Sequence, residues 1–217
     1  MASKDPLDDL LSVYDSSVLK NTKKVLKILE EAYILTIPGL IAKSMTDRLS
    51  QSSGVEFHHG TPESELRRIA SWLFTLAGEN HVALLKVAKG AWKRHGREDL
   101  RIAGLIVANV NPAILSEGPW QELANLVGRS EPLEALLEVI EEIARSNAKT
   151  PADDVFDRWR KSSPILHHMV LLILKVCNRR DNISELTEVQ KVIIQNRPPG
   201  PELMERIAEG LLNSASL

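Results

Sequence analysis

Basic side chains concentrate in the middle of the chain, with types and spacing that would suit contacts with phosphate groups. This group consists of Lys86, Lys89, Lys93, Arg94, Arg97 and Arg101. Its three lysines stand at positions i, i+3 and i+7, which places them on one face of a helix. Phosphates are neutralised by positive charge and need no exact side-chain code. The alternative is an ordinary solvated helix face, balanced by the nearby acids Glu79, Glu98 and Asp99.

Two histidine pairs and one cysteine are the residues to consider for metal chemistry. His58-His59 lies in a polar segment, and His167-His168 lies near an expected helix start. Adjacent side chains on a helix point about 100° apart, so such a pair is poorly placed to hold one ion. Cys177 ends an apolar run, which predicts a buried and unreactive thiol. We therefore expect neither a metal site nor a cofactor.

The composition is that of a globular, helix-rich protein. Hydrophobic residues make up 43% of the chain and charged residues 26%, whereas aromatic residues make up only 4%. The formal net charge of −2 argues against nucleic-acid binding through bulk charge, but it leaves a local basic face open. The chain has no apolar run of membrane-spanning length and no signal-like apolar core near Met1. We expect no membrane partner and a cytoplasmic location.

Proline, glycine and capping residues divide the chain into roughly a dozen expected helices. Their expected ranges are 7–14, 18–37, 40–49, 61–77, 79–94, 97–108, 119–127, 131–147, 150–161, 164–178, 183–195 and 201–212. Among the boundary signals, Thr61 offers a capping hydroxyl, and Gly78 and Gly96 are placed to end helices. Residues 1–17 are expected to form an N-terminal extension, and the polar segment 50–61 a mobile loop.

Helix pairs recur at intervals of about forty residues, the repeat length of HEAT-type arrays. This predicts an all-α fold, a HEAT-like α-solenoid of antiparallel helix pairs that forms one domain over residues 1–217. A closed helical bundle would produce a similar pattern, and periodicity alone does not choose between the two.

Segment 91–106, which reads AWKRHGREDLRIAGLI, carries a resemblance to a known family. It resembles the pattern found in DNA alkylation-repair proteins, the HEAT-like repeat alkylpurine DNA glycosylases. Segment 60–70 is similar to the entry segment of that family, and segment 120–126 to its helix with catalytic residues. Segment 157–164 resembles the turn before a cleft-lining helix. The similarity spans residues from about 20 to 195 and favours the open solenoid over the bundle.

The resemblance implies a curved solenoid whose concave, basic face holds duplex DNA. It also implies a metal-independent excision of alkylated purines. The family usually places an acid one turn after the tryptophan of its active helix. Here that position after Trp120 holds Ala124 beside Asn125, and Glu122 lies on a different helical face. We therefore assign no catalytic residue and expect glycosylase activity to be weak or absent.

The same resemblance gives the tryptophans two interpretations. An indole face would attract a cationic alkylated base, whereas inter-helix packing is the structural alternative. Trp72 and Trp92 are assigned to the core, and the alternatives stay open for Trp120 and Trp159. Three further residues are candidate DNA contacts: Arg158 and Lys161 near Trp159, and His168, which stands where the family offers an arginine.

Two functions follow as hypotheses. The first is a DNA-binding protein of the alkylation-repair type that contacts duplex DNA. The second is a non-catalytic scaffold with a protein partner, because solenoids offer extended binding surfaces and a fold does not determine a function.

Overall fold

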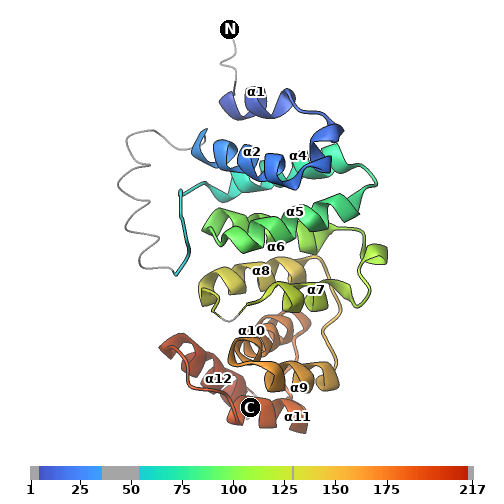
Figure 1. Ribbon diagram of the computed structural model, residues 1–217. Coiled ribbons are helices and arrows are strands. Elements are labelled where there is room, and N and C mark those ends of the chain that lie inside the picture. Colours follow the sequence, from blue (N-terminus) through green and yellow to red (C-terminus); the bar gives the residue numbers. More distant parts are fainter. Residues whose placement is uncertain (1–4, 36–53, 129, 215–217) are drawn as a thin grey trace. The chain divides into compact units, whose positions relative to one another are not determined.

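The computed structural model describes residues 5–35, 54–128 and 130–214, and within these ranges every regular element is a helix (Figure 1). The all-α prediction is therefore confirmed. The chain divides into two compact units, Met1–Ser116 and Glu117–Leu217. Each unit is described separately below, and the HEAT-like arrangement and the single domain remain predictions. The expected helix at 40–49 lies outside the described residues.

Unit 1 is built around a helix that is buried along nearly its whole length. The elements of this unit are α1 (Pro6–Ser12), η1 (Ser16–Lys20), α2 (Thr22–Leu35), α4 (Glu63–Ala77), α5 (His81–Arg94), α6 (Arg97–Asn109) and η2 (Pro112–Ile114). Every residue of α6 from Glu98 to Ala108 is buried. Helices α4 and α5 pack against α6, and α2 packs against α5. Helix α6 is thus the core of the unit.

Unit 2 has a central helix of the same kind. Its elements are α7 (Gly118–Leu126), α8 (Leu133–Arg145), α9 (Asp153–Ser162), α10 (Pro164–Asp181), α11 (Glu188–Gln195) and α12 (Glu202–Ser214). Helix α10 begins at Pro164 with the Ser163 hydroxyl accepting the N–H of Leu166, and its segment 169–174 has no exposed surface. Helices α8, α9 and α12 pack against it.

Several helix boundaries differ from their sequence signals for identifiable reasons. Residues 18–35, the described part of the expected helix 18–37, are divided between η1 and α2, because Asn21 accepts the N–H of Lys24 and starts a new helix. Thr61 does not cap α4; its hydroxyl donates to the carbonyl of Tyr33 instead. Helix α5 ends at His95 in the left-handed conformation, one residue before the expected Gly96, whereas Gly78 ends α4 as expected.

Within the described ranges, no helix has both the length and the apolar character needed to cross a membrane.

Candidate nucleic-acid interface

Lys86, Lys89 and Lys93 share one exposed face of α5, as their spacing predicts. The face is bounded on one side by Gly90, where α2 packs closely. A β-carbon at Gly90 would lie 3.0 Å from Leu26 Cδ1 and 3.1 Å from Thr22 Cγ2. The lysines therefore lie beside the α2–α5 contact and point to solvent.

Helices α2 and α5 run in the same direction, which is visible in unit 1 of Figure 1. Thr22 and Leu26 meet Gly90, and one turn farther along α5 the Arg94 guanidinium donates to the Leu26 carbonyl at 2.8 Å. Glu30, one turn farther along α2, lies 3.4 Å from Arg94. A step along one helix thus corresponds to a step along the other, so side chains on their exposed edges form parallel rows.

The second row belongs to η1 and α2, and it consists of the exposed Lys20, Lys23 and Lys27. We call the two rows together the lysine surface: Lys20, Lys23, Lys27, Lys86, Lys89 and Lys93. Acidic side chains lie at one end of it, where Lys27 Nζ is 4.0 Å from Glu31 and Glu30 contacts Arg94. The other end of the surface, with Lys20, Lys23 and Lys86, therefore carries the stronger positive charge.

A cavity of about 560 Å³ lies between the starts of the two lysine rows, at the end of the surface away from Glu30 and Glu31. Lys20 and Lys86 both line it, together with the polar side chains of Ser17, Thr22 and Asn80. Of the described residues that line this cavity, none is acidic. The cavity therefore adds hydroxyl and amide groups to the two cations, a combination that suits an anionic oxygen.

Arg94, expected in the basic group, is held inside unit 1. Its Nε and Nη2 donate to the two carboxylate oxygens of Asp99 at 2.7 and 2.6 Å. Asp99 has no exposed surface, and it also accepts the hydroxyl of Tyr33 at 3.0 Å. Burial raises the pKa of Tyr33 well above its ordinary value, and the Asp99 charge raises it further, so the hydroxyl remains a donor. The structure thus gives Arg94 a role inside unit 1, and its contact with DNA stays a prediction.

Arg101 is likewise withdrawn from the surface, with 5% of its area exposed. Its Nε and Nη2 donate to the Glu63 carboxylate at 3.0 and 2.5 Å. Arg97 is half-buried and donates to the carbonyl of Thr61 at 3.2 Å. The basic group of the sequence therefore separates into lysines that face solvent and arginines that join α6 to its neighbours.

Glu98 has a structural role that the sequence interpretation missed. It has no exposed surface, and its Oε1 accepts the backbone N–H groups of His59, Gly60 and Thr61 at 3.0, 2.9 and 3.2 Å. These bonds attach the described part of the expected mobile loop to α6. The sequence did contain a signal for this role, because the two adjacent acids Glu98 and Asp99 lie just before the apolar run 102–108 of the same helix. Such acids need buried partners, so the solvated-face alternative does not describe Glu98 or Asp99.

Gly96 allows the Phe57 ring to lie close to the turn between α5 and α6. A β-carbon there would lie 2.0 Å from Phe57 Cζ, a clash with the ring. The N–H of Arg97 donates to the Phe57 carbonyl at 2.9 Å, and the N–H of Glu56 donates to the His95 carbonyl at 3.0 Å. The turn between α5 and α6 thus receives segment 54–61 directly. Trp92, next to this turn, is buried as expected, and Trp72 is half-buried.

In unit 2 the structure brings Trp120, Trp159 and Arg158 together around a small cavity of about 120 Å³. The two indoles are 4% and 3% exposed. Trp120 Nε1 donates to the Lys149 carbonyl at 3.0 Å, and Trp159 Nε1 donates to Gln121 at 3.2 Å. Buried rings with satisfied N–H groups join helices. Of the two interpretations left open, inter-helix packing fits these indoles, and stacking on a base does not.

The remaining candidates of unit 2 divide into surface cations and a buried ring. Arg158 is 57% exposed and lies 3.8 Å from Glu117, and Lys161 is exposed and paired with Asp157. His168 is buried against Gly200, where a β-carbon would lie 2.8 Å from its Nε2. Burial lowers the pKa of His168 and favours the neutral ring. The contact of His168 with DNA stays a prediction, for a ring that the structure buries inside unit 2.

His167 and Cys177, also considered for chemistry, are buried in unit 2. His167 Nε2 lies 2.8 Å from the Ile193 carbonyl, to which it donates. Burial raises the pKa of the Cys177 thiol, which agrees with the predicted unreactive cysteine. Among residues 5–35, 54–128 and 130–214, no group of three or more His, Cys, Asp and Glu side chains is arranged to hold a metal ion.

Comparison of the chain with protein-family models, with curated proteins and with solved structures finds no match. The functional argument therefore depends on the residues themselves.

Proposed function

We propose that this chain is a DNA-binding protein of the alkylation-repair type, which contacts the backbone of duplex DNA through the lysine surface of unit 1. The observation that carries the binding proposal is the pair of parallel lysine rows on η1–α2 and α5. The alkylation-repair part of the proposal depends on the resemblance of segment 91–106.

The dimensions of the lysine surface support a contact with a phosphate backbone. Lys86 and Lys93 are seven residues apart, which corresponds to about 10 Å along a helix. That length covers about three nucleotide steps of a DNA strand at about 3.4 Å each. The axes of packed helices lie about 8–10 Å apart, so the second row offers a parallel set of charges. Lysine is a flexible point charge, which suits phosphates in different registers.

The chain has a net charge of −2, so attraction to DNA must come from this local surface. Binding through six lysines would release the counterions of about six phosphates. The logarithm of the association constant should then fall with the logarithm of the salt concentration, with a slope of about −5. Fluorescence anisotropy of a labelled short duplex at several salt concentrations measures this slope. Absence of binding at low salt would contradict the proposal.

Charge-reversal variants test whether the lysine surface is the part of the chain that binds DNA. The double variant Lys89→Glu and Lys93→Glu should weaken binding for every duplex sequence and reduce the slope by about two, because each lysine contributes about one phosphate. The matched control is Lys149→Glu with Arg206→Glu, which changes the net charge equally at exposed positions of unit 2. Equal losses in the two double variants would show a general charge effect and would contradict the lysine surface.

Base excision is tested separately from binding. We expect at most weak release of alkylated purines, because Ala124 stands where the family usually has an acid and is itself 8% exposed. Incubation with a methylated duplex, followed by detection of abasic sites, measures the release. Efficient release would contradict this part of the proposal while leaving the binding part intact.

A second candidate, a protein-interaction scaffold, is favoured by a groove between α9 and α11 of unit 2. Val189 and Val192 are 40% and 43% exposed there, beside Asp153, Asp154 and Glu188, around a volume of about 440 Å³. This chemistry suits a basic amphipathic segment of a protein partner. A synthetic leucine–lysine peptide should lose affinity for Val189→Ser with Val192→Ser, but not for Val13→Ser, an exposed valine of unit 1. Equal affinity for all forms would contradict this candidate.

A further inference from the structure

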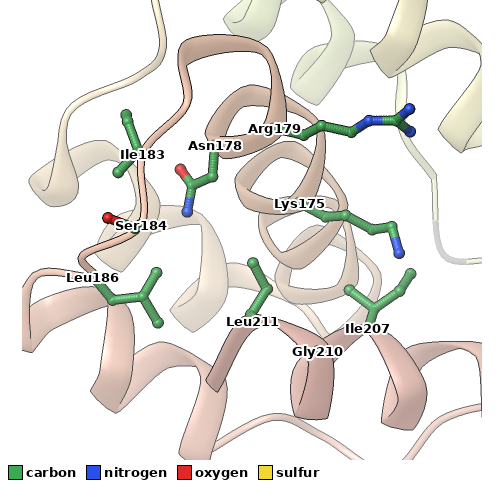
Figure 2. A pocket seen from close by; sticks show the side chains of 9 residues that line it. All are labelled: Lys175, Asn178, Arg179, Ile183, Ser184, Leu186, Ile207, Gly210 and Leu211. Carbon is green, nitrogen blue, oxygen red and sulfur yellow. The ribbon is translucent and has the colours of Figure 1, made fainter. Parts of the chain in front are cut away.

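Unit 2 contains a further cavity, of about 400 Å³, between the C-terminal half of α10, the segment after it and α12 (Figure 2). Cavities that hold small molecules have volumes of about 300–1,000 Å³. The cavity is thus large enough for a small ligand, and it is separate from the lysine surface of unit 1.

The floor of this cavity is apolar and its rim is cationic. Leu186, Ile207 and Leu211 are 7%, 2% and 8% exposed, so most of their surface is already covered by the protein. Lys175 and Arg179 are exposed and stand at i and i+4 on α10. Figure 2 shows both extending to the same side of α10, with Leu211 and Ile207 rising toward that helix from α12. None of the described residues that line the cavity is acidic.

Gly210 leaves part of the space empty. It lies within α12, and a β-carbon added to it would meet no atom within 4 Å. Glycine is the poorest helix former after proline, so its use at this position opposes helix formation. No neighbouring side chain fills the volume that its missing side chain leaves. Gly210 therefore enlarges the cavity next to Leu211.

We propose that this cavity binds an aliphatic monocarboxylate. The carboxylate is bound by Arg179 and Lys175, since a guanidinium matches a carboxylate with two parallel hydrogen bonds and an ammonium adds a second charge. The hydrocarbon chain lies along Ile207, Leu211 and Leu186 and passes Gly210. A small inorganic anion would not contact this apolar floor, whereas a neutral lipid would form no charge-assisted bond with Lys175 and Arg179.

A series of ligands tests the proposal on the full chain. Hexanoate, octanoate and decanoate are titrated by isothermal titration calorimetry, with decanol as the uncharged probe. We expect saturable binding of one molecule, with affinity rising by up to about fourfold for each added methylene. Decanol should bind at least about tenfold more weakly than decanoate, because it lacks the charge-assisted bonds. No saturable binding, or an affinity independent of chain length, would overturn the proposal.

Two kinds of variant assign the site. Gly210→Leu should abolish decanoate binding by filling the space, whereas Gly210→Ala adds one carbon and should reduce affinity only a few-fold. Lys175→Gln with Arg179→Gln should weaken decanoate at least tenfold and leave decanol unchanged. Because the last two positions are exposed, this variant tests the site even if Gly210→Leu fails to fold. Wild-type affinity in folded Gly210→Leu, or in the double variant, would overturn the assignment.

Discussion

The lysines of α5 and the arginines around the α5–α6 junction are adjacent in the sequence and differ completely in their surroundings. Lys86, Lys89 and Lys93 face solvent. Each of the two arginines instead donates two hydrogen bonds to one carboxylate: Arg94 to Asp99 and Arg101 to Glu63. A guanidinium offers a planar fork and is weakly hydrated, so it suits buried pairing, whereas an ammonium is strongly hydrated. The arginines therefore hold unit 1 together, whereas the lysines lie on its exposed face.

Arg94 and Asp99 form a pair because the chain reverses direction between α5 and α6. His95 ends α5 in the left-handed conformation at φ 57°, and Gly96 then permits contact with Phe57. The reversal places Arg94 opposite Asp99, five residues later, with Tyr33 from α2 completing the carboxylate's hydrogen bonds. Removing one member of a buried pair leaves the other charge uncompensated, which costs more than the pair contributes.

The largest effect is therefore expected for Asp99→Ala. Loss of the carboxylate removes the acceptor of Arg94 Nε and Nη2 and of the Tyr33 hydroxyl, so the free energy of unfolding should fall by about 3–5 kcal/mol. Urea denaturation measures the loss, and hydrogen-exchange mass spectrometry should locate it in α5 and α6. The matched change at an exposed charge, Glu79→Ala, should alter stability by less than about 0.5 kcal/mol. Similar losses of stability in Asp99→Ala and Glu79→Ala would contradict the structural role of the contact between Arg94 and Asp99.

A smaller loss is expected for Glu98→Gln. The amide keeps the size of the side chain and one acceptor oxygen, but it replaces a charged acceptor of three backbone N–H groups with a neutral one. Hydrogen bonds to charged groups are worth about 1.5–3 kcal/mol, so we expect a loss of about 1–3 kcal/mol. Amides of residues 59–61 should exchange faster in the variant. Unchanged exchange there would show that Glu98 does not hold this segment.

The helices of both units could be predicted from the sequence, because their boundaries are set by local chemistry. Pro62 and Gly78 bound α4, and Ser163 with Pro164 starts α10, as expected from the residues alone. The expected cap of α4 failed because its residue has a partner distant in sequence. The Thr61 hydroxyl bonds to Tyr33 rather than to α4, and nothing in segment 61–65 indicates that choice.

The candidate surface could be predicted only in part, for the same reason. The periodicity of Lys86, Lys89 and Lys93 identified an exposed face, since i, i+3 and i+7 spacing is a property of one helix. The second row on α2 joins that face through the packing at Gly90, which is a contact between distant segments. Local spacing likewise does not reveal that Arg101 pairs with Glu63, because the two residues belong to different helices.

The pH dependence of the free energy of unfolding distinguishes the hydrogen-bonded group of Tyr33, Asp99 and Arg94 from the exposed lysines. The pKa of Tyr33 is raised well above its ordinary value of 10.0 in the folded protein, so the folded state keeps a proton that the unfolded chain releases. Its contribution to stability is present below pH 10 and is lost as the pH rises above that value. Wild-type stability should decline above pH 10 more steeply than that of Tyr33→Phe, by up to about 1.4 kcal/mol per pH unit. Parallel declines in urea denaturation would contradict the buried hydroxyl.

The smallest effect on stability is expected at the lysine surface itself. Lys86→Ala with Lys93→Ala replaces two exposed side chains of α5 by the strongest helix former, so the free energy of unfolding should change by less than about 0.5 kcal/mol. The same variant should bind duplex DNA with a salt slope smaller by about two, because two phosphate contacts are lost. Urea denaturation and anisotropy on the same preparation measure both quantities. A large loss of stability would mean that these lysines, like Arg94, hold unit 1 together, and the distinction between the two sets of cations would fail.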